Sequence, residues 1–348
     1  MPEQSPGSRP TLEAVAARAG VSRATASRVV NGGDGVRAHL VERVRQAVEE
    51  LQYIPNHAAR TLVTRRTGAV AVVIAEPEIR IFSDPFFSRQ LRGISKELAE
   101  NDTQLVLLIV EGPGDFGRIE RYLSGGHVDG ALAFSLHTDD PLPAITRRAG
   151  LPTVYGGRPS WTTPPGERTV SYVDADNRGG ARAAVQHLRD LGRQRIAYIG
   201  GPPDQTSALD RFDGYRDIQI DVDPTLVAEG AFTVESGARA MAELLERRPD
   251  LDAVFAANDL MASGALRVLG ERGIPVPGRV AVVGFDDMAT VAEVTVPPLS
   301  TVRQDVEGQG RLMARLLLRG LDRDRAGQGA EAPDSVITPT TLVRRASS

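Results

Sequence analysis

The sequence contains no cysteine and none of the common catalytic signature motifs. Without cysteine, the chain cannot form a disulfide, a thiolate nucleophile, a Cys-ligated zinc site or a Cys-held iron–sulfur cluster. The five histidines never fall four residues apart, so no helical pair of metal ligands is expected. A GxSxG elbow, a GxxxxGKS/T phosphate loop and a GxGxxG turn between a strand and a helix are also missing. The sequence therefore predicts a protein that is not an enzyme and uses no metal ion or cofactor.

Long apolar segments are absent as well. The longest apolar runs, 70–75 and 104–110, have the length of a strand, whereas a membrane-spanning helix needs about 18–20 apolar residues. The first thirty residues lack the basic segment and the apolar segment of an export signal. We expect a cytoplasmic protein with no membrane partner.

What the chain does contain is an uneven distribution of charge. Its 348 residues carry 41 basic and 45 acidic side chains, a net charge of −4, on a length that fits two or three domains of about 100–200 residues. Residues 1–66 hold ten arginines against six acids, a net charge of +4, which leaves −8 for the remainder. A basic segment before an acidic body indicates that only this segment meets a polyanion, although solvated surface charge would give the same counts.

Residues 11–52 have the pattern of a small helical domain. Thr11 can cap a helix whose apolar positions recur at helical spacing, and Gly20 suits the left-handed residue that ends it. Ser22 can cap a second helix over 23–30, and a third, amphipathic helix is predicted over 38–52. Two short helices joined by a tight glycine-containing turn form a helix-turn-helix.

The N-terminal region closely resembles the headpiece of the LacI/GalR family of transcription repressors, on the segments TLEAVAARAGVS, TASRVVN and YIPNHAARTLV. The resemblance continues through five further motifs in family order: VDGALAFS (128–135), DNRGGARAAVQHLRDLGRQRIAYIGGP (176–202), VFAANDLMASGALRVL (254–269), VAVVGFDD (280–287) and LSTVRQD (299–305). A helix-turn-helix pattern alone is moderately specific, whereas this ordered series is very specific. Two positions depart from the family pattern: Ala26 replaces the usual valine, and Arg37 replaces the serine that usually caps the third helix.

The resemblance implies DNA contacts from the second helix, which such headpieces place in the major groove. The positions that match base-contacting residues are Arg23, Ala24 and Arg28. Arg23 can offer two parallel donors to guanine, so we expect a half-site that contains G; the alternative for both arginines is nonspecific phosphate contact. The residues expected to contact phosphate are Thr11, Ser22, Thr25, Ser27 and Asn31 in the head and Asn56, His57 and Arg60 beyond it.

Residues 56–63 match the family's hinge, which becomes helical when two heads bind an operator. Leu62 matches the leucine that is inserted into a central base step of the minor groove, where it unstacks and kinks the duplex. The alternative is that Leu62 packs on the body of the protein.

From residue 68 onward, strand-like and helix-like segments alternate, which predicts an α/β fold with parallel sheets. The strands are predicted at 69–75, 104–109, 130–134, 153–155, 171–173, 195–200, 253–256 and 280–284, with helices such as 182–191, 238–247 and 260–272. By resemblance, this region is a two-lobed periplasmic-binding-protein-like core. The expected divisions are a disordered terminus (1–10), a head (11–55), a hinge and linker (56–67), lobe 1 (about 68–172 and 305–331) and lobe 2 (about 173–304 and 332–346).

Ligands of open α/β sheets bind at the carboxyl ends of the strands. The side chains expected to bind the effector there are Phe82, Asp84, Arg158, Trp161, Ser207, Arg211, Phe232, Asn258, Asp286 and Gln304. Arginines, carboxylates and amides can bind paired sugar hydroxyls, and aromatic rings can pack against the C–H faces of a sugar. The resemblance implies that Arg211 clamps the effector.

Several of these residues have a structural alternative. Arg211 and Asp286 would also suit a salt bridge between the lobes. Phe82 and Phe86, which the segment EPEIRIFSDPFF places at the mouth of the cleft, would equally suit an ordinary core. Trp161 lies in the loop RPSWTTPPGE, which suits either a specificity loop or a mobile surface.

Within the family, the chain is most like the members that respond to cello-oligosaccharides, on the segments NHAARTLVTRRT, SDPFF, HVDGALAFSLHTDDPLP, YGGRP and VSYVDADN. We therefore predict a homodimeric repressor of carbohydrate-utilisation genes that binds a palindromic operator and is released by a sugar inducer, cellobiose or a short cello-oligosaccharide. The alternatives are a different sugar, a purine-type corepressor that strengthens DNA binding, or a solute-binding receptor without DNA function. Dimerisation is expected through the lobe faces, with the helix over 89–101 as a candidate, and no leucine heptads follow the last strand to form a tetramer.

Overall fold

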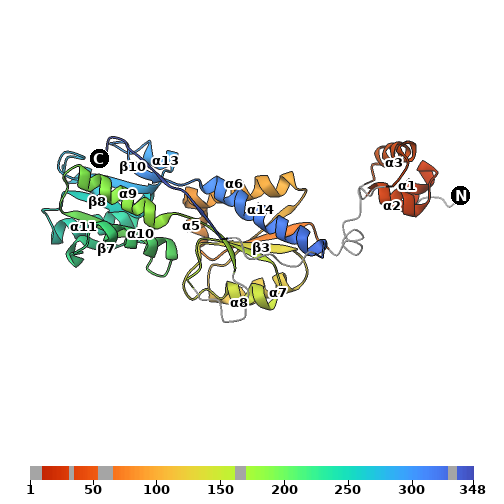
Figure 1. The fold of residues 1–348 in the computed structure, drawn as a ribbon, viewed down its shortest axis with the longest axis horizontal. Coiled ribbons are helices and arrows are strands. Elements are labelled where there is room, and N and C mark those ends of the chain that lie inside the picture. Colours follow the sequence, from red (N-terminus) through yellow and green to blue (C-terminus); the bar gives the residue numbers. More distant parts are fainter. Residues whose placement is uncertain (1–9, 31–34, 54–65, 161–169, 328–334) are drawn as a thin grey trace. The chain divides into compact units, whose positions relative to one another are not determined.

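The structure is a computed structural model that describes residues 10–30, 35–53, 66–160, 170–327 and 335–348. The chain divides into two compact units, residues 1–68 and 69–348 (Figure 1). The predicted disordered terminus lies almost wholly outside the described residues.

The first unit is a three-helix head made of α1 (Leu12–Ala19), α2 (Arg23–Val30) and α3 (Ala38–Glu50). Thr11 caps α1 by accepting the backbone N–H of Ala14 at 3.3 Å, and Gly20 ends the helix with a left-handed φ of 60°. The hydroxyl of Ser22 accepts the N–H of Thr25 at 3.1 Å and caps α2. All three predicted helix boundary signals are thereby confirmed.

The core of the head is small and aliphatic. Val15 and Ala19 of α1 pack against Val44 and Ala47 of α3 and against Tyr53. Ala26, the unusual residue of α2, is fully buried at this junction. The side chain of Arg37 forms no cap on α3, and the helix ends at Glu50, two residues before the predicted end.

The second unit begins with a lobe that is built on a six-stranded parallel sheet. Its elements are β1 (Ala69–Ile74), α5 (Glu78–Ser83), α6 (Pro85–Glu100), β2 (Gln104–Ile109), the 3-10 turn Pro113–Asp115, α7 (Phe116–Ser124), β3 (Gly130–Phe134), α8 (Leu142–Arg148), β4 (Thr153–Gly156), β5 (Ser171–Ala175), α14 (Val306–Arg325) and β11 (Ser335–Thr338). The strand order is β11-β5-β4-β3-β1-β2. Helices α6 and α14 cover one face and α7 and α8 cover the other (Figure 1). A strand covered on both faces needs an unbroken apolar run, which is what AVAVVI in β1 supplies.

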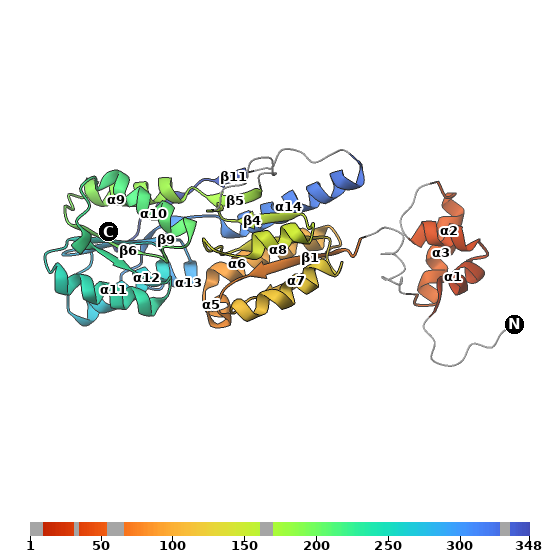
Figure 2. The ribbon, with the colours of Figure 1, turned by 90° about the horizontal axis from the view of Figure 1, so that it is seen from below.

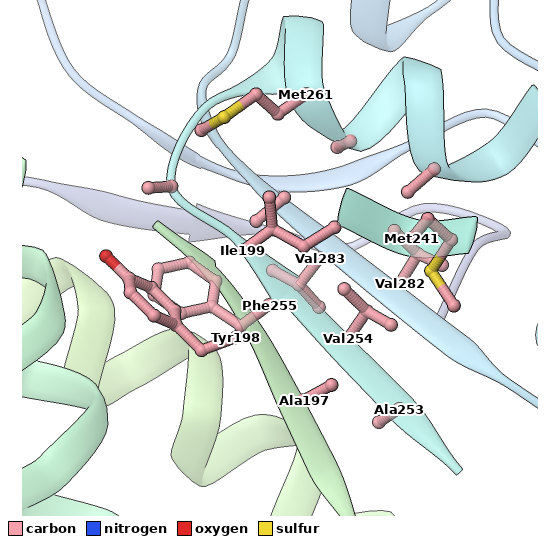
Figure 3. Packing of buried hydrophobic residues seen from close by; sticks show 14 of the residues in the cluster. Ala197, Tyr198, Ile199, Met241, Ala253, Val254, Phe255, Met261, Val282 and Val283 are labelled. Atoms are coloured by element: carbon pink, nitrogen blue, oxygen red, sulfur yellow. The ribbon is translucent and has the colours of Figure 1, made fainter. Parts of the chain in front are cut away.

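The second lobe repeats this arrangement. Its elements are α9 (Asn177–Asp190), β6 (Ile196–Gly200), α10 (Thr206–Ile218), the 3-10 turn Pro224–Leu226, β7 (Val227–Glu229), α11 (Val234–Arg247), β8 (Ala253–Ala256), α12 (Asp259–Glu271), β9 (Ala281–Asp286), α13 (Ala289–Ala292), β10 (Ser300–Arg303) and β12 (Thr341–Val343). The strand order is β12-β10-β9-β8-β6-β7, and β12 runs antiparallel to β10. Helices α9 and α10 lie on one side of the sheet and α11 and α12 on the other (Figure 2). Tyr198, Phe255 and Val283 from neighbouring strands are buried at the centre (Figure 3).

Three segments connect the lobes, between β5 and α9, between β10 and α14, and between β11 and β12. The first two end in an aspartate that caps the following helix: Asp176 accepts the N–H of Gly179 at 2.8 Å, and Asp305 accepts that of Gly308 at 2.9 Å. A Cβ atom on either glycine would come within 2.0 or 2.1 Å of the capping carboxylate. The repeated Asp-x-x-Gly spacing therefore sets the start of both helices.

Two of the expected lobe boundaries differ from the observed connections. The expected change at 172/173 falls inside β5, and the expected change at 331/332 would assign β11 to the second lobe. Instead, β11 pairs in parallel with β5, with Val336 opposite Val173, so both strands complete the first sheet. The chain crosses at Asp176 and again at residues 339–340 because this pairing holds the two strands together. Among the described helices, none is both long and apolar enough to span a bilayer.

Candidate functional site

The head exposes one side of α2. Arg23, Ala24 and Arg28, the three residues predicted to contact bases, are all exposed, whereas Thr25 and Ser27 are half-buried. The hydroxyl of Ser22 also hydrogen-bonds to that of Thr25 at 2.9 Å, so these two residues order the start of the helix as well as facing solvent. Asn31, Asn56, His57, Arg60 and Leu62 lie outside the described residues.

Arg23 has a partner within the head. Its Nε donates to Glu13 Oε1 at 2.6 Å, and the two side chains are 70% and 61% exposed. Backbone hydrogen bonding and the bond from Arg23 hold the pKa of the Glu13 carboxyl below its ordinary value. A solvated ion pair of this kind stabilises little, so Arg23 can exchange Glu13 for a guanine edge at small cost.

An Arg23→Ala variant is expected to lose base preference at one operator position by about 1–3 kcal/mol, because alanine offers no donors to guanine O6 and N7. Competition binding against operators that vary at each position measures this loss. Arg18→Ala is the matched control, since Arg18 lies on α1 and pairs with Glu50. A uniform loss of affinity across all sequences would instead identify Arg23 as a phosphate contact.

A large cavity lies between the lobes of the second unit, at the carboxyl ends of the strands. Its volume is about 730 Å³ including the open mouth. Seven of the ten residues predicted to bind the effector line it: Asp84, Ser207, Arg211, Phe232, Asn258, Asp286 and Gln304. The topology thus brings together side chains that are more than 200 residues apart in the sequence.

Arg211 on α10 occupies the centre of this group. Its Nε donates to Asn177 Oδ1 at 2.9 Å and its Nη1 donates to the carbonyl of Ala257 at 2.5 Å. Its Nη2 lies 3.3 Å from Asp286 Oδ1, and its guanidinium lies 3.8 Å from the centre of the Phe285 ring. The ion pair with Asp286 that was considered as the structural alternative therefore forms, but within the second lobe and not between the lobes. The arginine is held rigidly with its orientation fixed on all sides.

Three further amide side chains form hydrogen bonds around the cavity. Gln304 at the second crossover donates to Asp286 Oδ1 at 2.6 Å, and Gln309 donates to Gln304 Oε1 at 3.2 Å. Asn258 uses both ends of its amide, because it caps α12 through the N–H of Met261 and donates to the carbonyl of Phe232. These residues position the cavity wall as well as lining it.

Phe232 is held in an unusual backbone conformation. Its φ is 58°, in a region of backbone conformation that residues other than glycine rarely adopt. The cavity residues Ser135 and Asp286 also have positive φ values, of 61° and 104°. The ring lies against Gly201, where a Cβ atom would come within 2.2 Å of it. Strain of this kind concentrates at binding sites. The guanidinium of Arg80 lies 5.4 Å from the centre of the same ring.

Asp84 combines a structural contact with a raised pKa. It caps α6 by accepting the N–H of Phe86 at 2.9 Å, and it is 5% exposed. Burial raises the pKa of its carboxyl to about 6. Burial also raises the pKa of Asp174, which accepts the N–H groups of Arg158 and Ala175. Both carboxyls accept backbone N–H groups and form no salt bridge with a described residue.

Two of the other predicted effector residues, Phe82 and Arg158, are not among the residues that line the cavity. Phe82 is 68% exposed on the short helix α5, so it belongs neither to the cavity wall nor to the core. Phe86, considered for the core, is half-buried and lines the cavity. The guanidinium of Arg158 pairs with both carboxylate oxygens of Asp210 on α10, at 2.6 and 3.2 Å. Trp161 lies outside the described residues.

A histidine connects the lobes beside the cavity. His137 Nδ1 lies 2.6 Å from Asp204 Oδ2 in the second lobe, and its Nε2 lies 3.3 Å from Glu76 Oε1 in the first. Gln205 of the second lobe donates to the same Glu76 oxygen at 2.9 Å. The hydrogen bond to Glu76, helped by that to Asp204 and opposed by burial, raises the pKa of His137 to about 9.

This pair of contacts predicts a pH dependence of stability. Because the folded pKa lies above the ordinary value of 6.5, the stabilisation is fully present below pH 6.5 and is lost as the pH rises through about 9. We expect a loss of about 2 kcal/mol, less than the full shift because the ring is partly exposed. Urea unfolding of the wild type and of His137→Asn across this range measures it. Parallel pH profiles for the two proteins would contradict the assignment.

Further residues line the cavity although the sequence did not predict them to bind the effector. Arg80, Gln90, Asp174, Asn177 and Gln309 all line the cavity. Asp174 and Asn177 lie in the segment VSYVDADN, which was a usable signal because Asp174 is near the carboxyl end of β5 and Asn177 follows that strand. Arg80 and Gln90 lie on helices whose sequence gives no sign of a binding role.

The chain matches known proteins over both units. Residues 11–56 match the model of the bacterial regulatory proteins of the lacI family, and residues 185–348 match that of the periplasmic binding protein-like domain. The chain is 49% identical over 343 residues to the HTH-type transcriptional regulator CelR of Thermobifida fusca, covering 97% of this chain and 98% of that one.

Two solved structures are similar throughout. The transcriptional regulator CelR–cellobiose complex has a TM-score of 0.76 and 46% identity, covering 98% of this chain and 100% of that chain. The lac repressor dimer bound to operator and to the anti-inducer ONPF has a TM-score of 0.81 and 28% identity, covering 98% of this chain and 99% of that chain.

Proposed function

This chain belongs to the lacI family of bacterial regulatory proteins, and we propose that it is a repressor that leaves its operator when cellobiose or a short cello-oligosaccharide binds between its lobes. The family assignment confirms the predictions of a DNA-binding transcriptional regulator, and not an enzyme, with a helix-turn-helix head and a two-lobed α/β core. The choice of effector rests on the 49% identity to CelR of Thermobifida fusca, together with the similarity to the solved structure of a CelR–cellobiose complex.

The charges of the cavity support an uncharged, hydroxyl-rich ligand. Both arginines that line it already have a carboxylate partner: Arg211 pairs with Asp286, and Arg80 Nη1 lies 2.6 Å from Glu76 Oε1. Asp84 and Asp174 add acceptors that form no salt bridge with a described residue. An anionic effector would have to compete for the arginines, whereas sugar hydroxyls can donate to the carboxylates and accept from the arginines.

Release from DNA follows from linkage. A sugar that contacts both lobes favours one arrangement of the lobes, and the operator favours the arrangement in which the hinges order in the minor groove. If bound sugar lowers the affinity for the operator by a given factor, bound operator must lower the affinity for the sugar by the same factor. The coupling free energy in such systems is typically about 1–3 kcal/mol.

The operator and the oligomer are part of the same proposal. Two heads of a homodimer would read two half-sites related by a two-fold axis, which makes the operator palindromic. Helix α6 is the proposed dimer face, because its outer side presents Ser88, Arg92 and Ser95 to solvent while its inner side packs on α14. Sedimentation of the protein with and without operator tests the dimer.

Thermal unfolding with a panel of ligands tests the effector. Cellobiose and cellotriose should raise the unfolding temperature by mass action, whereas glucose, maltose, lactose and hypoxanthine should raise it less at equal concentration. A larger shift with hypoxanthine would support a purine-type corepressor, and a larger shift with another sugar would reassign the inducer.

A further inference from the structure

Two side chains of the cavity carry buried polar atoms that have no hydrogen-bond partner in the described chain. They are Nε of Arg80 on α5 and Oε1 of Gln90 on α6. Buried polar atoms are nearly always paired, so each exception needs a reason. Of the buried side-chain atoms without a partner in the described residues, only these two belong to residues that line the cavity.

Gln90 is placed where an apolar side chain would fit. It is 2% exposed and lies on the face of α6 that also carries the core residues Phe87 and Ile94. Its Nε2 lies 3.0 Å from Met313 Sδ on α14, and a thioether is a weak acceptor. An amide that makes so little use of its hydrogen-bonding capacity destabilises the fold relative to leucine. Stability alone therefore does not account for a glutamine at this position.

Arg80 is held in place while its Nε stays unpartnered. Its Nη1 pairs with Glu76, a carboxylate that is 4% exposed. Its guanidinium lies 5.8 Å from the ring centre of Phe87 in the first lobe and 5.4 Å from that of Phe232 in the second. These contacts fix the plane of the guanidinium, and Nε remains as a donor without an acceptor.

The other central polar groups of the cavity are committed to one another. Arg211 donates to Asn177 and Ala257, Gln304 donates to Asp286, and both ends of the Asn258 amide are used. A ligand that binds among them meets an oriented wall, whereas Arg80 Nε and Gln90 Oε1 are a buried donor and a buried acceptor with no partner among the described residues.

We propose that Arg80 and Gln90 form a hydroxyl-binding pair that helps to determine which sugar the protein accepts. This inference rests on the proposed sugar effector. A sugar hydroxyl donates its hydrogen to Gln90 Oε1, and a sugar oxygen accepts the hydrogen of Arg80 Nε. Hydroxyl groups can fill both roles, because each is a donor and an acceptor. A site built to hydrogen-bond a hydroxyl discriminates strongly against a ligand that lacks it.

The test is cellobiose binding by calorimetry to the full-length wild type, Gln90→Leu and Arg80→Lys. We expect each variant to bind cellobiose about tenfold more weakly, because each loses one hydrogen bond to the ligand. Gln90→Leu should also unfold at a higher temperature than the wild type, because it removes an unpartnered buried amide. Arg80→Lys keeps the charge beside Glu76 but has no Nε. Unchanged cellobiose affinity in both variants would overturn the proposal.

A matched control and a second readout separate binding from packing. Ile94→Val lies one turn along α6 in the same core, and it should lower the unfolding temperature while leaving cellobiose affinity unchanged. One monodeoxy derivative of cellobiose should lack the hydroxyl that Gln90 binds. The wild type should bind this derivative about tenfold more weakly than it binds cellobiose, whereas Gln90→Leu should bind the derivative and cellobiose with equal affinity. If every derivative loses as much affinity relative to cellobiose in Gln90→Leu as in the wild type, Gln90 does not bind a sugar hydroxyl.

Failure of the proposed effector and failure of the hydroxyl-binding pair give different results. If the wild type binds no sugar of the panel, the proposed effector class is wrong and this inference falls with it. If the wild type binds cellobiose and both variants bind it equally well, the effector stands and only the hydroxyl-binding pair is refuted.

Discussion

An Arg211→Lys variant is expected to bind its operator normally and to stay bound when cellobiose is added. The guanidinium of Arg211 contacts Asn177, Ala257 and Asp286 at once and lies on the Phe285 ring. A lysine ammonium is a single point charge and cannot hold this planar set of contacts. We expect sugar affinity to fall by about 100-fold, or about 2.7 kcal/mol, measured by calorimetry and by operator release.

The control for Arg211→Lys is the same exchange on the surface of the same lobe. Arg178→Lys alters a two-pronged ion pair with Asp217 that is exposed to solvent, and it should leave the response to cellobiose intact. Arg211→Ala should lose the response as well, and it should also lower stability by about 3–5 kcal/mol, because Asp286 would keep a buried charge without a partner. Normal release by cellobiose in Arg211→Lys would place the effector site elsewhere.

A Leu62→Ala variant is expected to lose about 2 kcal/mol of operator affinity, or about 30-fold, while it binds cellobiose like the wild type. The expectation rests on the match between residues 56–63 and the hinge of the family, since Leu62 lies outside the described residues. A leucine inserted in a base step buries its side chain and holds the bend that lets the protein contact more DNA, and alanine is too short for both.

Fluorescence anisotropy on a labelled operator measures the loss for Leu62→Ala. Val63→Ala is the matched control, because it truncates the neighbouring apolar side chain without touching the predicted wedge. Unchanged operator affinity in Leu62→Ala would remove the wedge role and favour packing of Leu62 on the body of the protein.

Local signals in the sequence predicted the parts of the fold that local interactions determine. Thr11, Gly20 and Ser22 act on residues no more than five positions away, and all three behave as predicted. The strands 104–109, 130–134 and 253–256 agree to the residue. The last two are buried throughout, and a buried parallel strand needs an apolar run that starts and stops abruptly.

For two helices that contain glycine in their first turns, the predicted first residue lies several positions after the observed one. Helix α9 begins at Asn177, five residues before the predicted start, and α11 begins at Val234 instead of 238. Glycine disfavours a helix by local propensity, yet a Cβ on Gly180 would come within 3 Å of Phe285 and Val302, and one on Gly237 within 2.2 Å of the Met261 backbone. Close packing across the lobe requires these glycines, and no neighbour in sequence reveals it.

The site was predictable where a side chain directly follows a strand. Asn258 and Asp286 lie at the ends of β8 and β9 and reach the cavity as expected. Arg158 follows β4 in the same way, but its partner Asp210 is 52 residues away and draws it out of the cavity. Gln90 is a candidate only because Met313, 223 residues away, gives its amide so poor a partner. Pairings over such distances in sequence need the folded structure.

The most direct test of the account is operator affinity measured with and without cellobiose, on a palindromic operator selected by the protein from random DNA. We predict that saturating cellobiose raises the operator dissociation constant by about 5–150-fold, and that saturating operator weakens cellobiose binding by the same factor. An operator affinity that cellobiose leaves unchanged or strengthens would contradict the assignment of this protein as a repressor released by cellobiose.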